Sequence, residues 1–551
     1  MTYSLPELLD VALTAKLAAL QNADIVARIW SKDARVWTNA HEAKWLGWLT
    51  IADEELAHLE RYREFAENIG QDGFKDILLM GMGGSSLCPE VLALTFNRSN
   101  FHILDSTVPS QVQAIESKID IAKTLFIVAS KSGSTLEPNC FKQYFFDRVV
   151  QTVGKENAGK QFVAITDPGS KMEAAAKADG FRHIFYGKPE IGGRYSALSA
   201  FGLTAAASMG LDIERLLGAG SKMSEACRNG EPPSNPGLLL GSILGICHGA
   251  GRDKLTIFTS PEIHDLGAWL EQLIAESTGK NGVAIIPVDR EPLQPAVSYG
   301  DDRVFVHLKF NGSDSGADLS ELFAAGHPVI EITINDLYDL GAEFFRWEFA
   351  TAVAGAALGI NPFDEPNVSE AKEKTKALLG ALLPTGRPPE SSPTASSATV
   401  DVFSSRFTGG SPSAVVRAAL SSLAPPDYVA FLSYLPPDSD IAQAVGDIRA
   451  GLRSRYRVAS TFGIGPRYLH STGQYHKGGP DTAVAFILTA DDATGTVIPE
   501  VGYTFSVLKR AQALGDTETL EAHARRTVRI QIKDAAHAAA TLERLFAEAM
   551  R

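Results

Sequence analysis

The 551-residue sequence has few cysteines, no long uncharged apolar run and no block of basic residues. Its four cysteines, Cys88, Cys140, Cys227 and Cys247, lack the spacing of a metal site or a disulfide framework. They therefore indicate reduced thiols and a cytoplasmic location. No stretch is apolar enough to cross a bilayer, and residues 1–25 predict an amphipathic helix rather than a signal peptide.

Negative charge predominates, because 65 Asp and Glu residues face 51 Lys and Arg residues and leave a formal net charge of −14. Without a basic patch, this balance argues against nucleic acid or an anionic membrane as a partner. A phosphate group would have to be held by a local positive potential. The hydrophobic fraction of 45% is typical of a globular protein, and the length allows two to four domains.

Strand-like and helical patterns alternate along most of the chain after a helical segment that ends near residue 72. The strand-like runs are 76–82, 101–105, 124–129, 161–166 and 182–186, then 254–260, 283–288, 303–310 and 328–334, and finally 427–433, 456–460, 482–489 and 526–532. This alternation predicts an α/β fold with open, mostly parallel sheets flanked by helices. A stretch rich in Pro, Ser and Gly at 383–397 predicts a linker.

A hydroxyl-rich turn follows the apolar run 124–128. It contains Ser130, Lys131, Ser132 and Thr135 and leads into a predicted helix near Glu137. Backbone N–H groups at a helix start, hydroxyl donors and a lysine together favour a phosphate. An ordinary serine-rich helix cap is the alternative.

A glycine-rich turn at 81–86 follows the strand-like run 76–80. Gly83, Gly84 and Ser85 allow the backbone to approach a ligand closely. The glycine spacing of the dinucleotide fingerprint is absent, so a phosphosugar site built from two loops at neighbouring strand ends fits better.

Two further segments carry candidate catalytic side chains. Arg194 follows Gly193 at the start of an Ala-rich helix and suits either an anion or a surface salt bridge. Gln272 and Glu276 lie four residues apart on one helix face, and Glu276 occupies the last turn before Gly279. The negative end of the helix dipole raises the pKa of a carboxylate there, which suits a general base, although a solvated glutamate is the commoner case.

Five segments, Gly81–Ser86, Ser130–Thr135, Gly192–Ser199, Gln272–Gly282 and Asn361–Pro366, occur in the order found in phosphoglucose isomerases. The chain resembles that family, and most of all the isomerase half of bifunctional transaldolase/phosphoglucose isomerase proteins. The resemblance spans roughly residues 75–380. It implies two sugar-isomerase (SIS) domains, each a doubly wound, mostly parallel sheet, one active site, a homodimer and no cofactor or metal. A separate transaldolase chain is a further candidate partner.

The resemblance also implies a role for each matching residue. Ser85, Ser130, Lys131, Ser132 and Thr135 would bind the phosphate, beside Gly83, Gly84 and Gly193. Arg194 would stabilise an enediolate, Gln272 would contact substrate hydroxyls and Glu276 would be the base. Lys372 matches the lysine that follows the family's Asp-x-Pro element.

The family's ring-opening histidine is missing from its usual place shortly after the glutamate. A similar segment occurs downstream, at Arg467–Gly479, and it precedes a strand as in the family. Counting back from that strand selects His470, whereas anchoring on Ser471–Gln474 selects His476. We therefore expect part of the second SIS domain to lie beyond the linker.

The expected organisation is a helical segment at 1–72, a first SIS domain at 73–215 and a second at 216–380. A linker at 381–400 then leads to a segment at 401–551 that completes the second domain and carries the histidine loop. The implied activity is reversible isomerisation of glucose 6-phosphate and fructose 6-phosphate in glycolysis and gluconeogenesis. The alternatives are a dual phosphoglucose/phosphomannose isomerase and a non-catalytic phosphosugar sensor.

Overall fold

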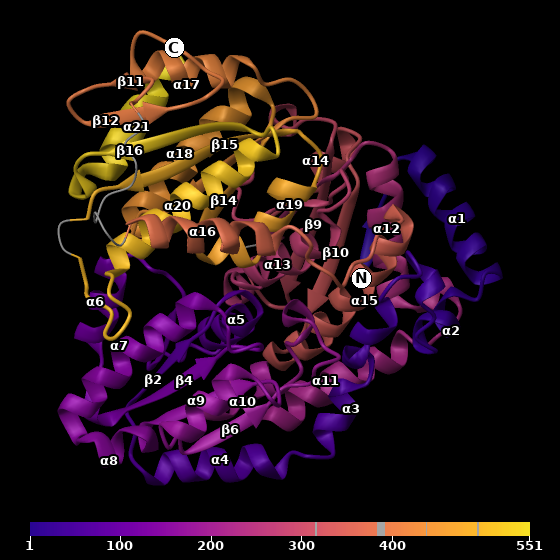
Figure 1. The fold of residues 1–551 in the computed structure, drawn as a ribbon. Coiled ribbons are helices and arrows are strands. Elements are labelled where there is room, and N and C mark those ends of the chain that lie inside the picture. The colour runs from indigo at the N-terminus through magenta and orange to yellow at the C-terminus, as the bar shows by residue number, and fades with distance from the viewer. Residues whose placement is uncertain (314–316, 383–391, 437, 493–494) are drawn as a thin grey trace.

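The structure is a computed structural model that describes residues 1–551 except 314–316, 383–391, 437 and 493–494. Three α/β sheets with helices between them make up the fold (Figure 1). The first sheet lies at the bottom of Figure 1 and the third at the top, with the second beside them. Among the described residues, no helix is both long and apolar enough to cross a membrane.

The first sheet has five parallel strands in the order β3-β2-β4-β5-β6. Its strands are β2 (Asp76–Met80), β3 (Phe101–Leu104), β4 (Thr124–Ala129), β5 (Phe162–Thr166) and β6 (His183–Tyr186). The strand order reverses direction between β2 and β4. In open parallel sheets, the loops that leave the strands at such a switch point diverge and form a ligand-binding crevice.

Both faces of the first sheet are buried because successive side chains of each strand point to opposite faces. In β2, Ile77 and Leu79 face one core, and Leu78 and Met80 face another. The flanking helices include α4 (Glu60–Gln71), α5 (Leu87–Thr95), α6 (Pro109–Lys118), α7 (Leu136–Val153), α8 (Lys155–Ala158), α9 (Lys171–Ala178) and α10 (Ala200–Ser208).

The second sheet has the order β1-β10-β9-β7-β8. Its parallel strands are β7 (Lys254–Thr259), β8 (Ile286–Val288), β9 (Arg303–Phe310) and β10 (Val329–Ile334), and β1 (Thr2–Ser4) is an antiparallel edge strand. The accompanying helices are α1 (Glu7–Asn22), α2 (Ile25–Trp30), α3 (Ile51–Leu56), α11 (Ile213–Ala226), α12 (Pro236–Gly249), α13 (Leu266–Thr278), α14 (Ser320–Ala324) and α15 (Leu340–Leu358).

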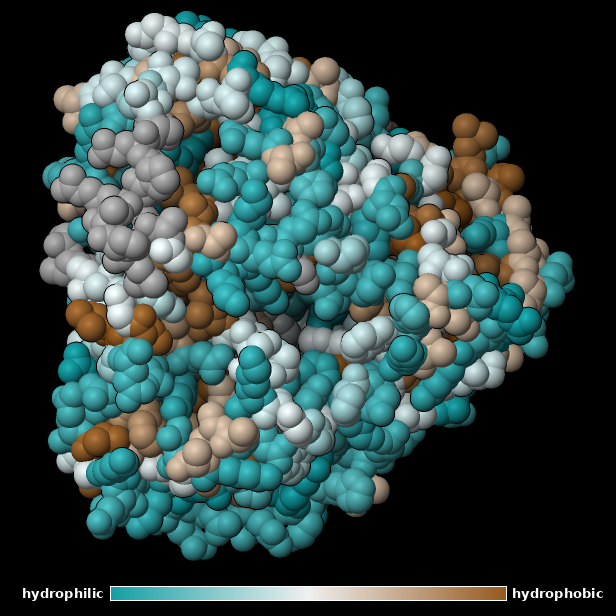
Figure 2. Space-filling model, viewed as in Figure 1, coloured by the Kyte–Doolittle hydropathy of each residue, from teal (hydrophilic) through white to brown (hydrophobic). Residues whose placement is uncertain are grey.

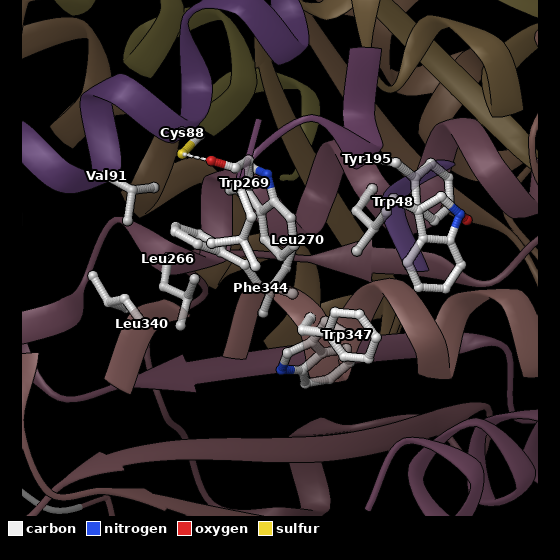
Figure 3. Close-up of a cluster of buried hydrophobic side chains, with 14 of the residues drawn as sticks. Trp48, Cys88, Val91, Tyr195, Leu266, Trp269, Leu270, Leu340, Phe344 and Trp347 are labelled. Carbon is white, nitrogen blue, oxygen red and sulfur yellow. Dashed lines mark hydrogen bonds between the residues drawn. The ribbon is translucent and has the colours of Figure 1, made fainter. Parts of the chain in front are cut away.

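A single apolar core joins the first and second sheets through their helices. Trp269 of α13 packs edge-on against Phe344 of α15, with ring centroids 4.8 Å apart. Trp48 lies in the same core against Tyr195, at 5.3 Å (Figure 3). Because α13 is anchored along this buried face, its last turn is held rigidly in place.

The third sheet has six strands in the order β11-β12-β16-β15-β13-β14. They are β11 (Ala395–Ser396), β12 (Val400–Phe403), β13 (Tyr428–Ser433), β14 (Ala459–Ile464), β15 (Ala483–Ala490) and β16 (Arg526–Ile532). Its helices are α16 (Val368–Leu382), which leads towards it, and α17 (Pro412–Ser421), α18 (Ser439–Tyr456), α19 (Gly473–Gly478), α20 (Phe505–Ala522) and α21 (Ala538–Ala549).

The α/β class with mostly parallel sheets is confirmed, but the prediction that 401–551 completes the second sheet is wrong. That segment forms a separate sheet with its own apolar core. Its other face packs on α13 and β8, so it meets the second sheet through side chains and not through strand pairing. The predicted linker also differs, because β11 and the start of β12 occupy its last residues, while 383–391 lie outside the described residues.

Candidate active site

A pocket of about 370 Å³ lies at the carboxyl ends of the first sheet, where the three sheets meet. Segments that follow β2, β4, β5 and β6 form one side of it, and the space-filling view shows a recess in the middle of a mostly hydrophilic face (Figure 2). Most of the residues predicted from sequence line this pocket: Gly84, Ser85, Ser130, Lys131, Ser132, Thr135, Gly193, Arg194, Gln272, Glu276, Lys372 and His470.

The glycine-rich turn after β2 is pressed against two other parts of the site. A Cβ on Gly84 would lie 2.1 Å from the carbonyl oxygen of Gly193, and one on Gly83 would lie 2.6 Å from that of His470. Gly83 does not line the pocket, but it allows the histidine loop to approach the turn. These glycines are therefore required for close contact between backbone segments, whereas the sequence predicted a close approach to a ligand.

The hydroxyl-rich turn after β4 is arranged as a phosphate cradle. Thr135 is the N-cap of the 18-residue helix α7, and Gly133 has a φ of +67° in the turn. The Ser130 hydroxyl is buried, lines the pocket and has no hydrogen-bond partner among the described residues. A buried, unpaired donor beside a helix N-terminus suits an anionic oxygen.

Lys131 is held at the cradle by a carboxylate that the sequence analysis did not single out. Its ammonium pairs with Asp167, which follows β5, and donates to the carbonyl oxygen of Lys188 at 3.0 Å. Asp167 also lines the pocket. The charge of Lys131 is therefore partly compensated, and the cradle is less positive than the sequence suggested.

Glu276 has the environment of a general base. It lies in the last turn of α13, is 8% exposed, and its Oε2 accepts a hydrogen bond of 3.1 Å from Gln272. Burial raises the pKa of Glu276, the nearby charge of Arg194 opposes this effect, and the net shift is upward from 4.5. A carboxylate with a raised pKa accepts a proton more readily at neutral pH.

Arg194 is buried and held in place on several sides. Its Nε donates to Ser277 Oγ at 2.8 Å, and its Nη2 donates to the carbonyl oxygens of Pro362 and Asp364 at 2.9 Å each. Its Nη1 lies 3.5 Å from Glu276 Oε1. A guanidinium held this firmly can stabilise negative charge that develops beside the base, at little cost in reorganisation.

The structure separates the two candidate histidines. His470 lines the pocket, with its Nε2 3.1 Å from Glu137 Oε1. His476 is buried outside the pocket lining, with its Nδ1 3.0 Å from the Tyr428 hydroxyl. Burial, reinforced by the charges of Lys477 and Arg525, holds the pKa of His476 well below 6.5. His470 is therefore the histidine that can reach a ligand.

Glu137 orients His470 and is itself held by the third sheet's helix α20. Gln512 Nε2 donates to Glu137 Oε1 at 2.7 Å, and Thr107 donates to Gln512 Oε1 at 2.7 Å. Burial alone would raise the pKa of Glu137, but the charge and hydrogen bond of His470 outweigh burial and lower it. An ionised Glu137 keeps the proton on Nε2 and directs the other ring nitrogen elsewhere.

Arg467, three residues before His470, anchors the histidine loop to the first sheet. Its Nε lies 2.6 Å from Asp105 Oδ2, and its Nη1 lies 2.7 Å from Glu90 Oε2. Asp105 also accepts a hydrogen bond of 3.1 Å from Ser86, in the glycine-rich turn. The ion pairs thus connect the third sheet to the turn that contacts His470.

We expect Arg467→Met to lower both stability and turnover. The substitution leaves Glu90 and Asp105 close together without their cation, which costs about 3 kcal/mol at a largely buried pair. Thermal unfolding and kcat would measure the two effects, with Arg510→Met as control, because Arg510 pairs with Asp491 at a more exposed position. An unchanged melting temperature and kcat for Arg467→Met would contradict the anchoring role.

The residues that the sequence analysis missed are Glu137, Asp167, Glu365, Arg467 and Gln512. Each acts through a partner that is distant in sequence, for example the 333 positions between His470 and Glu137. The one local signal was the position of Glu137 directly after the cradle, in the first turn of α7.

Among the described residues, no group of three or more His, Cys, Asp or Glu side chains is suited to a metal ion.

Comparisons with known proteins agree with this geometry. Residues 55–302 match the family model of phosphoglucose isomerase. The probable glucose-6-phosphate isomerase of Methanococcus maripaludis is 28% identical over 59% of this chain and 82% of its own length. The glucose-6-phosphate isomerase of Clostridioides difficile is also 28% identical, over 61% and 87%.

Two solved structures share the fold. A hypothetical protein of Thermus thermophilus, TT0462, superimposes with a TM-score of 0.57 at 24% identity and covers 68% of this chain and 99% of its own. A glucose-6-phosphate isomerase of Chlamydia trachomatis gives 0.51 at 21% identity, covering 60% and 74%. The family match includes the two phosphate loops, Arg194, Gln272 and Glu276 and ends before the histidine loop. Over residues 55–302, which hold most of the pocket's candidate site residues, the chain is therefore similar to phosphoglucose isomerases.

Proposed function

We propose that this chain interconverts glucose 6-phosphate and fructose 6-phosphate, as an isomerase of glycolysis and gluconeogenesis. The observation that carries the proposal is the pocket, in which a phosphate cradle, a carboxylate base, a buried guanidinium and a histidine meet. The similarity to phosphoglucose isomerases supports the same reaction, because the two relatives named above are a probable glucose-6-phosphate isomerase and a glucose-6-phosphate isomerase.

Binding begins at the phosphate. The hydroxyls of Ser130, Ser132 and Thr135 and the N–H groups at the start of α7 hold the phosphate, with Ser85 and Lys131 beside it. The sugar then extends from the cradle towards Gln272 and Glu276. Gly84 and Gly193 keep the backbone close to this path.

Ring opening follows as a proton transfer from O1 to O5. His470, whose Nε2 faces Glu137, takes up the proton that O1 loses on its other ring nitrogen and passes it to O5 as the bond between C1 and O5 breaks. Lys372, which also lines the pocket, assists at the oxygen atoms. The product is the open-chain aldehyde, with no change in oxidation state.

Isomerisation is a proton transfer between adjacent carbons. Glu276 removes the proton from C2, O1 gains negative charge in the enediolate, and Arg194 stabilises that charge. Glu276 then returns a proton to C1 while the proton of O2 moves to O1, which yields the ketose with a hydroxyl on C1 and a carbonyl at C2. Since each step moves only protons and the substrate undergoes no net redox change, we propose that no cofactor or metal takes part.

The test is the conversion of fructose 6-phosphate to glucose 6-phosphate in the presence of EDTA, read with glucose-6-phosphate dehydrogenase. We expect robust turnover that EDTA leaves intact. Saturable sugar-phosphate binding without turnover would instead indicate a phosphosugar sensor or a site that needs a partner chain. Comparable turnover of mannose 6-phosphate in the same series would identify a dual phosphoglucose/phosphomannose isomerase.

The role of Thr135 in the phosphate cradle can be tested separately. Thr135→Val removes a hydroxyl that lines the pocket at the phosphate end, and a hydrogen bond to a charged group is worth enough to weaken binding by about tenfold or more. We expect KM for fructose 6-phosphate to rise by that factor, with a smaller change in kcat. Ser134→Ala is the control, since Ser134 contacts Ser132 on the exposed side of the turn. Equal effects of both substitutions would contradict the phosphate assignment.

The assembly and location of the protein stay predictions. A homodimer, a separate transaldolase partner and a cytoplasmic location follow from the resemblance and from the cysteine content. Light scattering on the purified chain would measure its oligomeric state. Apolar side chains gather near α1 at the edge of the face in Figure 2, where Leu8 is 85% exposed.

A further inference from the structure

A second carboxylate, Glu365, lines the pocket beside the proposed base. It lies in the segment between α15 and α16, and its side chain is 47% exposed, so water reaches it. Its Oε2 lies 3.1 Å from Arg194 Nη1. The same nitrogen lies 3.5 Å from Glu276 Oε1, so one guanidinium nitrogen faces two carboxylates.

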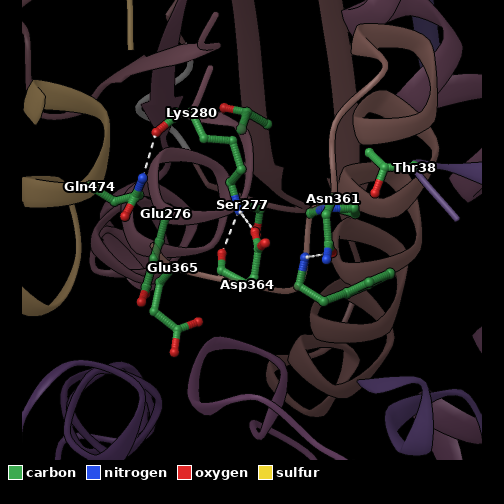
Figure 4. Close-up of polar contacts among 12 residues, drawn as sticks. Thr38, Glu276, Ser277, Lys280, Asn361, Asp364, Glu365 and Gln474 are labelled. Atoms are coloured by element: carbon green, nitrogen blue, oxygen red, sulfur yellow. Dashed lines mark hydrogen bonds and ion pairs between the residues drawn. The ribbon is translucent and has the colours of Figure 1, made fainter. Parts of the chain in front are cut away.

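The backbone around Glu365 is fixed on several sides. Asn361 Oδ1 accepts a hydrogen bond of 3.0 Å from the Phe363 N–H, and the carbonyl oxygens of Pro362 and Asp364 accept from Arg194. Lys280 pairs with Asp364 Oδ1 at 2.7 Å (Figure 4). These contacts hold the backbone of the segment in place, so the Glu365 side chain starts from a fixed position within reach of Arg194.

We propose that Glu365 is a positioning residue of this site, which shares Arg194 with Glu276 and thereby controls how readily Glu276 accepts a proton. The inference rests on the proposed function and deepens it. Neither the phosphate cradle nor the ring-opening histidine requires such a carboxylate, so its place beside the base needs an explanation of its own.

The groups that face Glu276 come from three segments. Arg194 precedes α10, Gln272 and Lys280 lie on and just after α13, and Glu365 lies before α16. Burial raises the pKa of Glu276, the positive charges of Arg194 and Lys280 lower it, and the negative charge of Glu365 raises it further. With Glu365 in place, Arg194 divides its attraction between two anions. Without Glu365, Glu276 would receive all of the attraction of Arg194 and would be a weaker base.

Glu276 acts in its deprotonated form, so activity is lost as the pH falls through its pKa. Glu365→Gln removes a negative neighbour, lowers the pKa of Glu276 and moves the acid limb of kcat/KM to lower pH. For two carboxylates within 4 Å of one nitrogen, we expect a shift of about one pH unit.

The experiment compares the pH dependence of kcat/KM for the full-length chain with that of Glu365→Gln and of Asp364→Asn. Asp364→Asn removes a negative charge from the adjacent residue, whose carboxylate pairs with Lys280, and we expect a smaller shift. A shift to lower pH that is specific to Glu365→Gln, with plateau activity retained within about tenfold, would support the proposal.

Two results would overturn the inference. The acid limb of Glu365→Gln could coincide with that of the unmodified chain, which would show that Glu365 does not act on the base. Plateau activity could instead fall by more than about a hundredfold, which would make Glu365 a proton carrier rather than a positioning residue. If the unmodified chain does not turn over the substrate, the proposed function itself fails. If the unmodified chain is active and either of the two results above is found, only this inference fails, so the two failures are distinguishable.

Discussion

Glu276→Gln is expected to lower kcat for both sugar phosphates by about 10²- to 10⁴-fold while leaving their affinity nearly unchanged. The amide has almost the same shape and keeps a polar contact with Gln272, so the pocket retains its form. The amide cannot accept the C2 proton, however, and among the described residues no other carboxylate lies where Glu276 does to accept it instead. Steady-state kcat and the dissociation constant from titration calorimetry measure the two quantities separately.

The matched control is Glu271→Gln on the same helix. Glu271 is outside the pocket lining, and burial raises its pKa to about 8, so its side chain is mostly protonated at neutral pH. A neutral amide therefore replaces a largely neutral acid, and we expect kcat within a few fold of that of the unmodified chain. Near-normal turnover of Glu276→Gln, or an equal loss in both variants, would contradict the assignment of the base.

His470→Asn is expected to lower kcat by about 10²-fold or more with the cyclic substrate, whereas His476→Asn is expected to affect stability. His470 lines the pocket and is oriented by Glu137, while His476 is enclosed beside Tyr428. Loss of the buried His476 contact lowers the melting temperature but leaves the reacting groups in place.

An open-chain substrate separates ring opening from a general loss of structure. A sugar phosphate that lacks the hydroxyl needed to close the ring should be isomerised by His470→Asn at a rate near that of the unmodified chain. A merely structural defect would slow cyclic and open-chain substrates alike. Loss of turnover in His476→Asn together with full activity in His470→Asn would reverse the assignment.

Sequence patterns predicted most of the strands because each lies in a run that is buried on both faces. The run at 124–129 is β4 residue for residue, and 303–310 is β9. The missed strands are β1, β11 and β12, which have only two to four residues each and are too short to show a strand pattern; β1 and β11 are edge strands, and β12 lies next to the edge. Which strands share a sheet depends on pairing between segments that are far apart in the sequence. Local patterns do not reveal this pairing, and the third sheet was therefore not predicted.

The same distinction between local and distant information applies to the site. The cradle at 130–135 and the pair Gln272 and Glu276 are short segments whose chemistry follows from their own residues. Glu137 and Gln512 are 375 positions apart and become partners only when α7 meets α20. His470 and His476 are close in sequence, but η12 (Arg467–His470) turns one towards the pocket and α19 buries the other.

The central claim, a proton transfer between C1 and C2 within this pocket, is tested most directly by isotope exchange. Glucose 6-phosphate is incubated with the protein in deuterium oxide and EDTA until the sugar phosphates reach equilibrium, and the C1 and C2 protons are followed by NMR. We predict that fructose 6-phosphate forms and that deuterium accumulates at C2 of glucose 6-phosphate, because the protonated base exchanges with water. Recovery of unlabelled glucose 6-phosphate, or formation of fructose 6-phosphate free of deuterium after many turnovers, would contradict the account.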